Sequence, residues 1–313
     1  VLEAALRDNV ALPYGCRNGA CGACKGKLLQ GAVDYGTHQP GSLTDDEKAR
    51  GLALLCTARP LGDLTLEAKE IAAARDIPVK TLPCRVERME RLATDVMALW
   101  LKLPSNERLQ FLPGQYIDFL LKDGRKRSFS LANPPGDDSL LELHIRHVPG
   151  GHFTEHVFND MKVKEIMRIQ GPLGSFFLRE SDRPAIFLAG GTGFAPVKSI
   201  LQHAFAHGDM RQMVLYWGAK TRADLYQAGL PDAWAHEHDQ FSYVPVLSEP
   251  RPEEAWPGRT GLVHQAILAD FADLSGYQVY ACGAPPMIEA ARRDFCARGL
   301  PEDAFFSDAF AYQ

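Results

Sequence analysis

The sequence has neither an excess of positive charge nor a long apolar run. Its 34 Lys and Arg residues are outnumbered by 39 Asp and Glu residues, which gives a formal net charge of −5. Because nucleic-acid-binding proteins usually carry a basic patch or stripe, we expect no nucleic-acid partner. The longest apolar stretch, 185–197, contains three glycines and is shorter than the roughly 20 residues that span a bilayer. We therefore expect no membrane association.

Cysteine is scarce and unevenly placed. The chain has seven cysteines, and an odd number in a chain of this length does not indicate a disulfide framework. Four of them fall within the first 56 residues, at Cys16, Cys21, Cys24 and Cys56. Such clustering predicts a metal centre in a reducing compartment, so we expect the protein in the cytoplasm.

Length and composition are those of a globular protein with more than one domain. The chain has 313 residues, 46% of them hydrophobic and 23% charged, and length alone suggests about two domains. The patterns along the chain instead divide it into three regions, which we call the first (1–75), the second (76–182) and the third (183–313). The pattern of the first region predicts a short helix at its start and a Gly/Cys-rich loop at 15–26. It also predicts strands at 27–29 and 64–67, a capped helix that starts at 44–47, and a linker at 71–75.

The second region contains short alternating runs separated by turns, a rhythm that predicts an antiparallel barrel or sandwich. The expected strands are 80–88, 96–103, 115–121, 127–131 and 140–147. In the third region, apolar strands alternate with helical stretches, which predicts a parallel sheet covered by helices. Its expected strands are 185–189, 212–217, 241–247 and 278–282, and its expected helices are 196–207, 263–271 and 287–298.

The cysteines of the first region have the spacing Cys16-x4-Cys21-x2-Cys24, with Cys56 following after 31 residues. Thiolates at this spacing bind a [2Fe–2S] cluster in plant-type ferredoxins. The glycines and alanines between them allow the backbone to wrap closely around a cluster and to aim N–H groups at its sulfurs. A structural zinc site is the alternative, but zinc ribbons usually pair two short Cys-x2–4-Cys knuckles. A dithiol redox pair of Cys21 and Cys24 is disfavoured because no thioredoxin-like strand and helix surround it.

Residues 14–24, with the sequence Tyr-Gly-Cys-Arg-Asn-Gly-Ala-Cys-Gly-Ala-Cys, resemble the cluster loop of plant-type ferredoxin domains. The resemblance implies a β-grasp fold for the first region, with the four cysteines as iron ligands. That family begins with a β-hairpin that is missing before the first helix here. We therefore expect the natural chain to begin before Val1.

Two motifs in the second region suit a dinucleotide. Arg127-Ser128-Phe129-Ser130 falls on an expected strand, and residues 145–154 combine Ile145-Arg146 with a Gly-Gly pair. The glycines would let the backbone approach a pyrophosphate, and Thr154 would open a helix whose N–H groups bind phosphate. The alternative is a plain β-barrel without a cofactor.

These motifs resemble the FAD domain of the ferredoxin–NADP reductase family. The resemblance implies that Arg127 contacts the pyrophosphate, that Phe129 packs on the flavin and that Ser130 lies near its reactive nitrogen. Phe129 replaces a tyrosine that is common in the family, so stacking is kept while a hydroxyl contact is lost. The residues expected to bind FAD are Arg127, Ser128, Phe129, Ser130, Ile145, Arg146, Gly150, Gly151, Phe153 and Thr154.

In the third region, a glycine turn from Gly190 to Pro196 joins an apolar strand to a helix, where a phosphate can bind. Its spacing is not the usual dinucleotide fingerprint, and a glycine turn alone also serves tight strand–helix packing. The turn and residues 280–287 resemble the pyridine-nucleotide domain of the same reductase family. The resemblance implies nucleotide contacts for Gly191, Thr192, Gly193, Pro196, Cys282 and Gly283. Cys282 would lie beside the nicotinamide, although its position alone also suits a small buried residue.

The end of the chain and one loop bear on the redox reaction. By the same resemblance, Phe310 would stack on the flavin, although ordinary packing explains it nearly as well. Lys220 and Arg222 face either the 2′-phosphate of NADPH or solvent. Through its resemblance to bacterial reductases with this three-domain order, we expect this chain to use NADH, with NADPH as the alternative.

Together the resemblances predict an NAD(P)H-dependent flavin and iron–sulfur reductase. Hydride would pass from NADH to FAD, and single electrons would then pass through the [2Fe–2S] cluster to a separate protein. Ser130, Cys282 and Phe310 would lie at the reacting groups, and no protein nucleophile is required. The acceptor would be an oxygenase component or a CDP-deoxysugar dehydrase. The cluster loop, 31–34 and 216–226 favour the latter through their resemblance to CDP-6-deoxy-Δ3,4-glucoseen reductases. A redox-sensing or zinc-binding interaction protein that retains the scaffold is the alternative.

Overall fold

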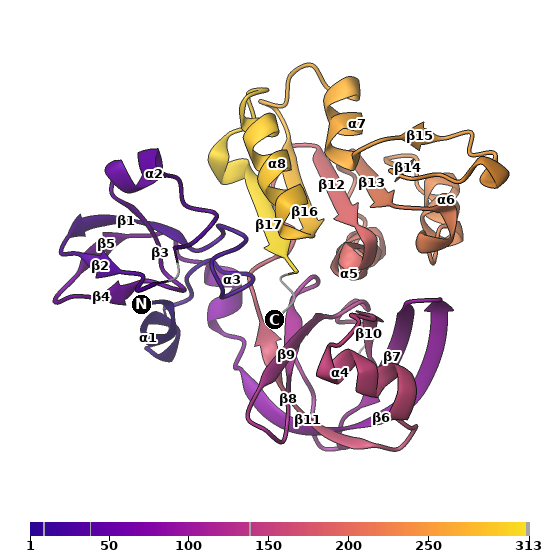
Figure 1. Cartoon of the computed structure of the whole chain (residues 1–313), viewed down its shortest axis with the longest axis horizontal. Helices are drawn as coiled ribbons and strands as arrows, with labels where there is room; N and C mark the ends of the chain where they lie inside the picture. Colours follow the sequence, from indigo (N-terminus) through magenta and orange to yellow (C-terminus); the bar gives the residue numbers. More distant parts are fainter. Residues whose placement is uncertain (9, 38, 138, 311–313) are drawn as a thin grey trace.

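The computed structural model describes all residues except 9, 38, 138 and 311–313. The described chain forms three lobes, with the first region at the left, the second below and the third above (Figure 1). The first lobe has a three-stranded sheet and a two-stranded ribbon, and each of the others has a six-stranded sheet. No described helix is both long and apolar enough to cross a membrane.

The first region is built from short elements. Its sheet has the order β3-β1-β5, and its ribbon pairs β2 with β4. The expected capped helix is present, because the Thr44 side chain accepts a hydrogen bond from the backbone of Glu47 and the Glu47 side chain accepts one in return. The expected linker at 71–75 contains a one-turn helix, since residues 72–75 are helical. The elements are α1 (Leu2–Arg7), β1 (Lys25–Gln30), β2 (Val33–Asp34), α2 (Asp45–Ala49), β3 (Leu52–Leu54), β4 (Arg59–Pro60), β5 (Thr65–Glu67) and α3 (Ala72–Arg75).

The second region is the predicted antiparallel barrel. Every strand pair is antiparallel, in the order β10-β7-β6-β11-β8-β9. A bridge between Leu131 and Leu143 joins the two outer strands. One strand, β11, lies outside the runs expected from the sequence. The elements are β6 (Lys80–Ala93), β7 (Val96–Lys102), β8 (Tyr116–Leu120), β9 (Lys126–Ser130), β10 (Leu141–Arg146), α4 (His152–Glu155), the π-helical turn η1 (His156–Asp160) and β11 (Ile166–Leu173).

The third region is the predicted parallel sheet with helices on both faces. Its strand order is β15-β14-β13-β12-β16-β17. Strands β13 to β15 are therefore added on one side of β12, and β16 and β17 on the other, so the order of the strands reverses beside β12. Ligands of such sheets bind outside the carboxyl ends of the strands at this reversal. The strands are β12 (Ala185–Gly190), β13 (Met213–Ala219), β14 (Phe241–Leu247), β15 (Arg259–Thr260), β16 (Gln278–Gly283) and β17 (Phe305–Ala309). The α-helices are α5 (Phe194–Ala206), α6 (Gly229–Glu237), α7 (Val263–Asp270) and α8 (Pro285–Cys296). Short 3-10 turns are η2 (Gly191–Gly193), η3 (Arg222–Asp224), η4 (Pro252–Glu254) and η5 (Glu302–Ala304).

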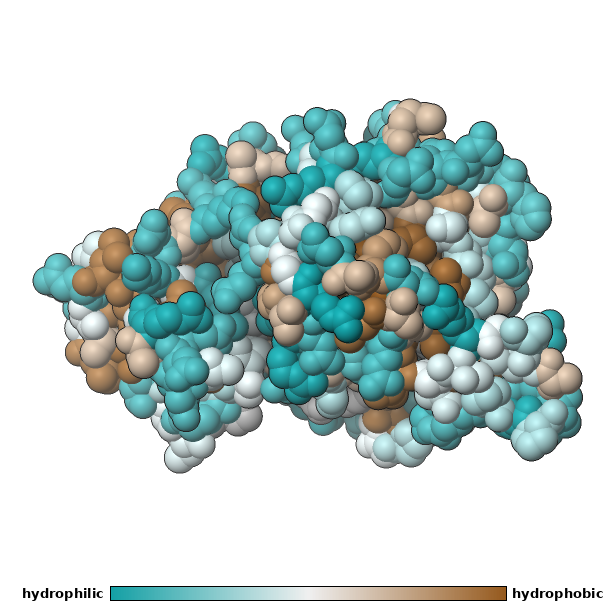
Figure 2. All heavy atoms as spheres, turned by 90° about the horizontal axis from the view of Figure 1, so that it is seen from above, coloured by the Kyte–Doolittle hydropathy of each residue, from teal (hydrophilic) through white to brown (hydrophobic). Residues whose placement is uncertain are grey.

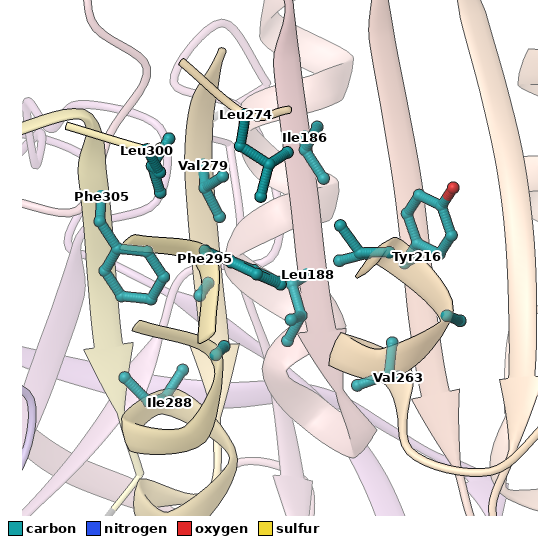
Figure 3. Close-up of a cluster of buried hydrophobic side chains, with 14 of the residues drawn as sticks. Ile186, Leu188, Tyr216, Val263, Leu274, Val279, Ile288, Phe295, Leu300 and Phe305 are labelled. Atoms are coloured by element: carbon teal, nitrogen blue, oxygen red, sulfur yellow. The ribbon is translucent and has the colours of Figure 1, made fainter. Parts of the chain in front are cut away.

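The core between α7, α8 and the sheet extends into the first region. Figure 3 shows Phe295 of α8 lying against Val279 and Leu188 of the sheet. Cys21 belongs to the same buried cluster, with Cys16 packed against it. The cysteine loop is therefore anchored on the third region. Figure 2 shows a largely hydrophilic upper surface with hydrophobic areas at the left end, over the first region, and right of the centre.

Candidate functional site

The four cysteines of the first region come together as two pairs. Cys16 shares a hydrogen bond with Cys21, and Cys24 shares one with Cys56. The bond from the Cys21 thiol, helped by backbone N–H groups, lowers the pKa of Cys16 to about 6. The N–H groups of Ala20 and Cys21 each donate to Cys16 Sγ at 3.3 Å. The loop therefore aims backbone dipoles at sulfur, as the sequence predicts, which favours thiolates.

The paired arrangement distinguishes two kinds of centre. In a [2Fe–2S] cluster with four cysteines, each iron takes two of them. A single zinc ion would instead draw all its ligands around one point. Across the described part of the chain, no three His, Cys, Asp or Glu side chains are gathered in that way. The two pairs are neighbours, because Cys21 interacts electrostatically with Cys24 and Cys16 with Cys56, and four thiols in two neighbouring pairs fit a two-iron cluster.

Close approach explains the glycines of the loop. A β-carbon at Gly15 would lie 2.9 Å from Asp308 Oδ1 and 3.3 Å from Cys21 Sγ. Gly22 has a φ of 74°, a left-handed conformation that few other residues adopt. Only glycine lets the backbone pass between the cysteines and β17 here.

The loop also contacts the second region. Arg17 Nη2 lies 2.5 Å from Asp118 Oδ2, and the hydroxyl of Ser128 donates to the other oxygen of Asp118 at 2.6 Å. The hydroxyl of Tyr116 donates to the Gly15 carbonyl at 2.9 Å. Because Ser128 belongs to the flavin motif, these bonds connect the cysteine loop with the strand β9 that carries that motif.

The third region holds the loop from the opposite side. Ser307 Oγ donates to the carbonyl of Cys21 at 3.0 Å, and Arg292 Nη2 donates to the same oxygen at 3.1 Å. The next residue, Asp308, is buried. Burial, with a smaller contribution from the charge of Cys16, raises the pKa of Asp308 to about 7. The cysteine loop thus lies where all three regions meet.

The two flavin motifs lie against each other. The ring of Phe129 on β9 is 5.4 Å from the ring of Phe153 on α4. Ser130 is buried, whereas the Arg127 guanidinium is partly exposed and donates to the Lys126 carbonyl at 2.8 Å. The structure therefore brings together the residues that the sequence separates by more than twenty positions.

The helix of the second motif begins earlier than expected. Thr154 does not open it, because α4 begins at His152 and Gly151 is its N-cap residue. The hydroxyl of Thr154 instead donates to the carbonyls of Val148 and Gly151, at 3.0 and 3.1 Å. It closes the Gly150–Gly151 turn, a structural role that spacing alone did not indicate.

The flavin and nicotinamide motifs also meet. A β-carbon at Gly191 would lie 2.9 Å from Arg146 Nη1, while Ile145, the neighbour of Arg146, is fully buried in the barrel. Arg146 forms an ion pair with Asp95 at 3.2 Å, and its Nη2 is buried with no hydrogen-bond partner among the described residues. Arg146 is thus the side chain of the barrel that reaches the glycine turn of the third region.

The nicotinamide motifs are in direct contact with each other. A β-carbon at Gly193 would overlap the carbonyl of Cys282, so only glycine fits. Thr192 is buried in the same turn, and α5 begins at Phe194, two residues before Pro196. Cys282 is fully buried, and burial raises its pKa well above the ordinary value, so its thiol is neutral.

The end of the chain returns to this turn. Strand β17 pairs with β16, and the N–H of Phe310 donates to the carbonyl of Gly283 at 2.8 Å. Phe310 is half-buried next to the nicotinamide motif. A single strand, β17, thus contacts the cysteine loop at Ser307 and leads directly to Phe310.

A buried polar chain that the sequence did not reveal joins the barrel to the third region. Lys198 Nζ donates to Glu142 Oε2 at 2.8 Å, Glu142 Oε1 bonds His144 Nε2 at 2.8 Å, and His144 Nδ1 bonds the hydroxyl of Tyr226 at 3.0 Å. Burial alone would raise the pKa of Glu142, but the bonds from His144 and Lys198 lower this pKa to about 2. No local periodicity marks such a chain, because its members come from β10, α5 and the turn that contains Tyr226.

Comparisons with known proteins cover nearly the whole chain. Residues 1–61 match the 2Fe-2S iron-sulfur cluster binding domain, 83–178 the oxidoreductase FAD-binding domain and 187–293 the oxidoreductase NAD-binding domain. The CDP-6-deoxy-L-threo-D-glycero-4-hexulose-3-dehydrase reductase of Yersinia pestis is 43% identical over 310 residues, covering 99% of this chain and 92% of that protein. The phenol 2-monooxygenase reductase component DmpP of Pseudomonas sp. (strain CF600) is 38% identical over 317 residues, covering 99% and 89%. The crystal structure of the Amycolatopsis cytochrome P450 reductase GcoB has a TM-score of 0.80 at 34% identity, covering 99% of this chain and 93% of that one.

Proposed function

Since the chain belongs to the family of reductases that join a 2Fe-2S domain to oxidoreductase FAD- and NAD-binding domains, we propose which of its residues hold the cofactors and which protein takes its electrons. The chain is an NAD(P)H-dependent electron-transfer reductase. When bound, FAD takes a hydride from the nicotinamide and supplies electrons singly to the [2Fe–2S] cluster, from which a separate protein receives them. We assign the three domains to residues 1–75, 76–182 and 183–313.

The four paired thiols are the proposed cluster ligands. Cys16 and Cys21 would hold one iron, and Cys24 and Cys56 the other. The single observation that carries this assignment is the pairing of the thiols, with backbone N–H groups directed at Cys16 Sγ. These groups would stabilise the negative charge of the centre.

The proposed FAD site is the edge of the barrel where β9 meets α4. Phe129 would provide the apolar surface for the ring system, with the buried Phe153 packed behind it, and Ser130 a hydroxyl near its reactive edge. The partly exposed Arg127 and the Gly150–Gly151 turn would hold the pyrophosphate. Ser128 fixes the strand through Asp118, while Ile145 anchors Arg146 in the barrel.

The proposed nicotinamide site lies at the start of α5. Gly191, Thr192, Gly193 and Pro196 form the turn whose free N–H groups would bind the phosphates. Cys282 and Gly283 face this turn from β16. Because its thiol is neutral, Cys282 would position the nicotinamide by contact and would not act as a nucleophile. Phe310 would cover the flavin until the nicotinamide arrives.

The proposed electron acceptor is a CDP-deoxysugar dehydrase, with an oxygenase component as the second candidate. The 43% identity to a dehydrase reductase, against 38% to a monooxygenase reductase, favours this order. We propose that neither a nucleic acid nor a membrane is a partner. The net charge of −5 disfavours binding to nucleic acid. All seven cysteines are free, which supports a reducing compartment such as the cytoplasm.

Replacing Cys56 by Ser tests the cluster assignment. The purified parent should contain FAD and give a [2Fe–2S] EPR signal after reduction by NADH. Cys56→Ser should lose that signal and NADH-driven cytochrome c reduction, while flavin-dependent ferricyanide reduction stays within about twofold. Cys296→Ser is the matched control, since Cys296 is also half-buried but lies on α8. A colourless, zinc-containing parent, or equal loss of both activities, would overturn the proposal.

The acceptor is tested by reconstitution. NADH oxidation should be coupled to sugar reduction when the protein is mixed with a CDP-deoxysugar dehydrase and its substrate. An oxygenase component should give a lower rate at equal concentration. Faster coupling to the oxygenase would reverse the order of the two candidates.

A further inference from the structure

We propose that Arg292 is a positioning residue of the third region that raises the reduction potential of the cluster through the Cys21 carbonyl. The inference rests on the proposed ligand role of Cys21 and adds a residue outside the first region. Arg292 lies on α8, 271 positions after Cys21, and no motif of the sequence includes it.

The contacts of Arg292 converge on one peptide group. Its Nη2 donates to the Cys21 carbonyl at 3.1 Å and to Ser307 Oγ at 3.2 Å, and Ser307 Oγ donates to the same carbonyl at 3.0 Å. Its guanidinium carbon lies 4.5 Å from the centre of the Phe305 ring. A β-carbon at Gly22 would be only 3.6 Å from Nη2. The guanidinium is therefore fixed in place against the cysteine loop.

The positive charge of Arg292 interacts with the nearby carboxylates of Glu47 and Glu302 without forming an ion pair with either. None of the ion pairs of the described residues includes Arg292, whereas its neighbour Arg293 pairs with Asp294 at 2.8 Å. The nearby Lys25 is paired with Glu47. A guanidinium remains charged at every pH that proteins tolerate. The loop thus faces a permanent cation from another region, one that is not held in an ion pair by any described residue.

Charge next to a cluster changes its potential. Reduction adds a negative charge to the centre, so a nearby cation stabilises the reduced form more than the oxidised form. The potential of an iron–sulfur cluster is set by net charge, hydrogen bonds and exposure. The bond to the Cys21 carbonyl also polarises the peptide that carries a ligand. Arg292 should therefore favour electron flow from flavin to cluster.

The test is an EPR-monitored redox titration of the intact, FAD-containing protein. Arg292→Gln should lower the midpoint potential by about 59 mV, which corresponds to a tenfold shift in a one-electron equilibrium. Arg292→Lys should stay close to the parent, because it keeps the charge. Ser307→Ala, which removes only a neutral donor, should give a smaller decrease. Arg293→Gln removes the adjacent, exposed charge of the same helix and should leave the potential unchanged.

Each outcome has a distinct meaning. Equal potentials for the parent and Arg292→Gln, or equal decreases for Arg292→Gln and Arg293→Gln, would overturn the inference. If Arg292→Gln does not retain the cluster, an unchanged potential in Ser307→Ala or a decrease of about 59 mV in Arg292→Lys would overturn it. A parent without any [2Fe–2S] signal would refute the proposed function itself.

Discussion

Arg17 and Asp118 form an ion pair across the boundary between the first and second regions, with 2.5 Å between Nη2 and Oδ2. The Asp118 side chain is fully buried, and it also accepts the hydroxyl of Ser128. Arg17 follows Cys16 directly and has a φ of 58°, a conformation that is unfavourable for a residue with a side chain. The ion pair holds this conformation, so one carboxylate fixes the cysteine loop relative to the flavin strand.

Replacing Arg17 by Gln should therefore impair transfer between the flavin and the cluster. We expect cytochrome c reduction to fall about tenfold, because small displacements of reacting groups have large effects on rate. Ferricyanide reduction, which needs only the flavin, should change less than about twofold. Stopped-flow reduction by NADH separates the two steps. Arg125→Gln, which removes an exposed ion pair with Asp123, should behave like the parent, and equal losses of both activities in Arg17→Gln would refute the link.

Replacing Lys198 by Met should destabilise the contact between barrel and third region. It leaves Glu142 as a buried carboxylate without its cation, which typically costs about 3–5 kcal/mol. The double variant Lys198→Met/Glu142→Gln should lose less than the sum of the single changes, because the two side chains interact directly. Urea denaturation followed by tryptophan fluorescence measures both. Lys220→Met, which breaks an exposed pair with Glu249, should cost less than about 1 kcal/mol.

Glu142 also predicts a pH dependence of stability. Its pKa is lowered from 4.5 to about 2 in the folded protein, so the carboxylate contributes stability above its unfolded pKa. That contribution, up to about 3 kcal/mol, is lost as the pH falls from 4.5 towards 2. Urea midpoints between about pH 6 and about pH 3 should thus decline more steeply for the parent than for Glu142→Gln. Parallel declines would show that Glu142 does not titrate in this way.

The loop after β13 predicts a preference for NADH. Lys220 pairs with Glu249 at 3.6 Å, and the N–H of Arg222 donates to the Glu254 carboxylate at 3.3 Å. These carboxylates would repel the 2′-phosphate of NADPH. We expect Glu249→Gln/Glu254→Gln to raise kcat/KM for NADPH about threefold to tenfold with little change for NADH. Glu237→Gln, on the exposed side of α6, is the control, and an unchanged cofactor ratio would contradict the prediction.

The parts of the molecule that the sequence predicted are those with local signals. Strand β14 has the predicted bounds 241–247, since a short apolar run between polar segments defines it. Thr44 and Glu47 form a capping box from residues three positions apart. Strand β17 was not predicted, because the buried polar residues Ser307 and Asp308 follow Phe305 and Phe306 and interrupt the apolar pattern.

The contacts that join the regions could not be predicted from one sequence. Arg17 and Asp118 are 101 positions apart, and Ser307 lies 286 positions from Cys21. No periodicity relates such residues, and each of them alone is an ordinary surface or strand residue. The spacing of the cysteines predicts which thiols lie close together. The structure adds the contacts from the other two regions that fix the cysteine loop in place.

The meeting of three regions at one loop limits how such proteins can be recombined. A cluster domain taken from another reductase would bring its own cysteines but would meet Asp118, Ser307 and Arg292 with a foreign loop. Functional chimeras should therefore require these interface positions to be exchanged as a set. As such sequences diverge, we expect the residues of the three domains that meet at this loop to change together rather than independently.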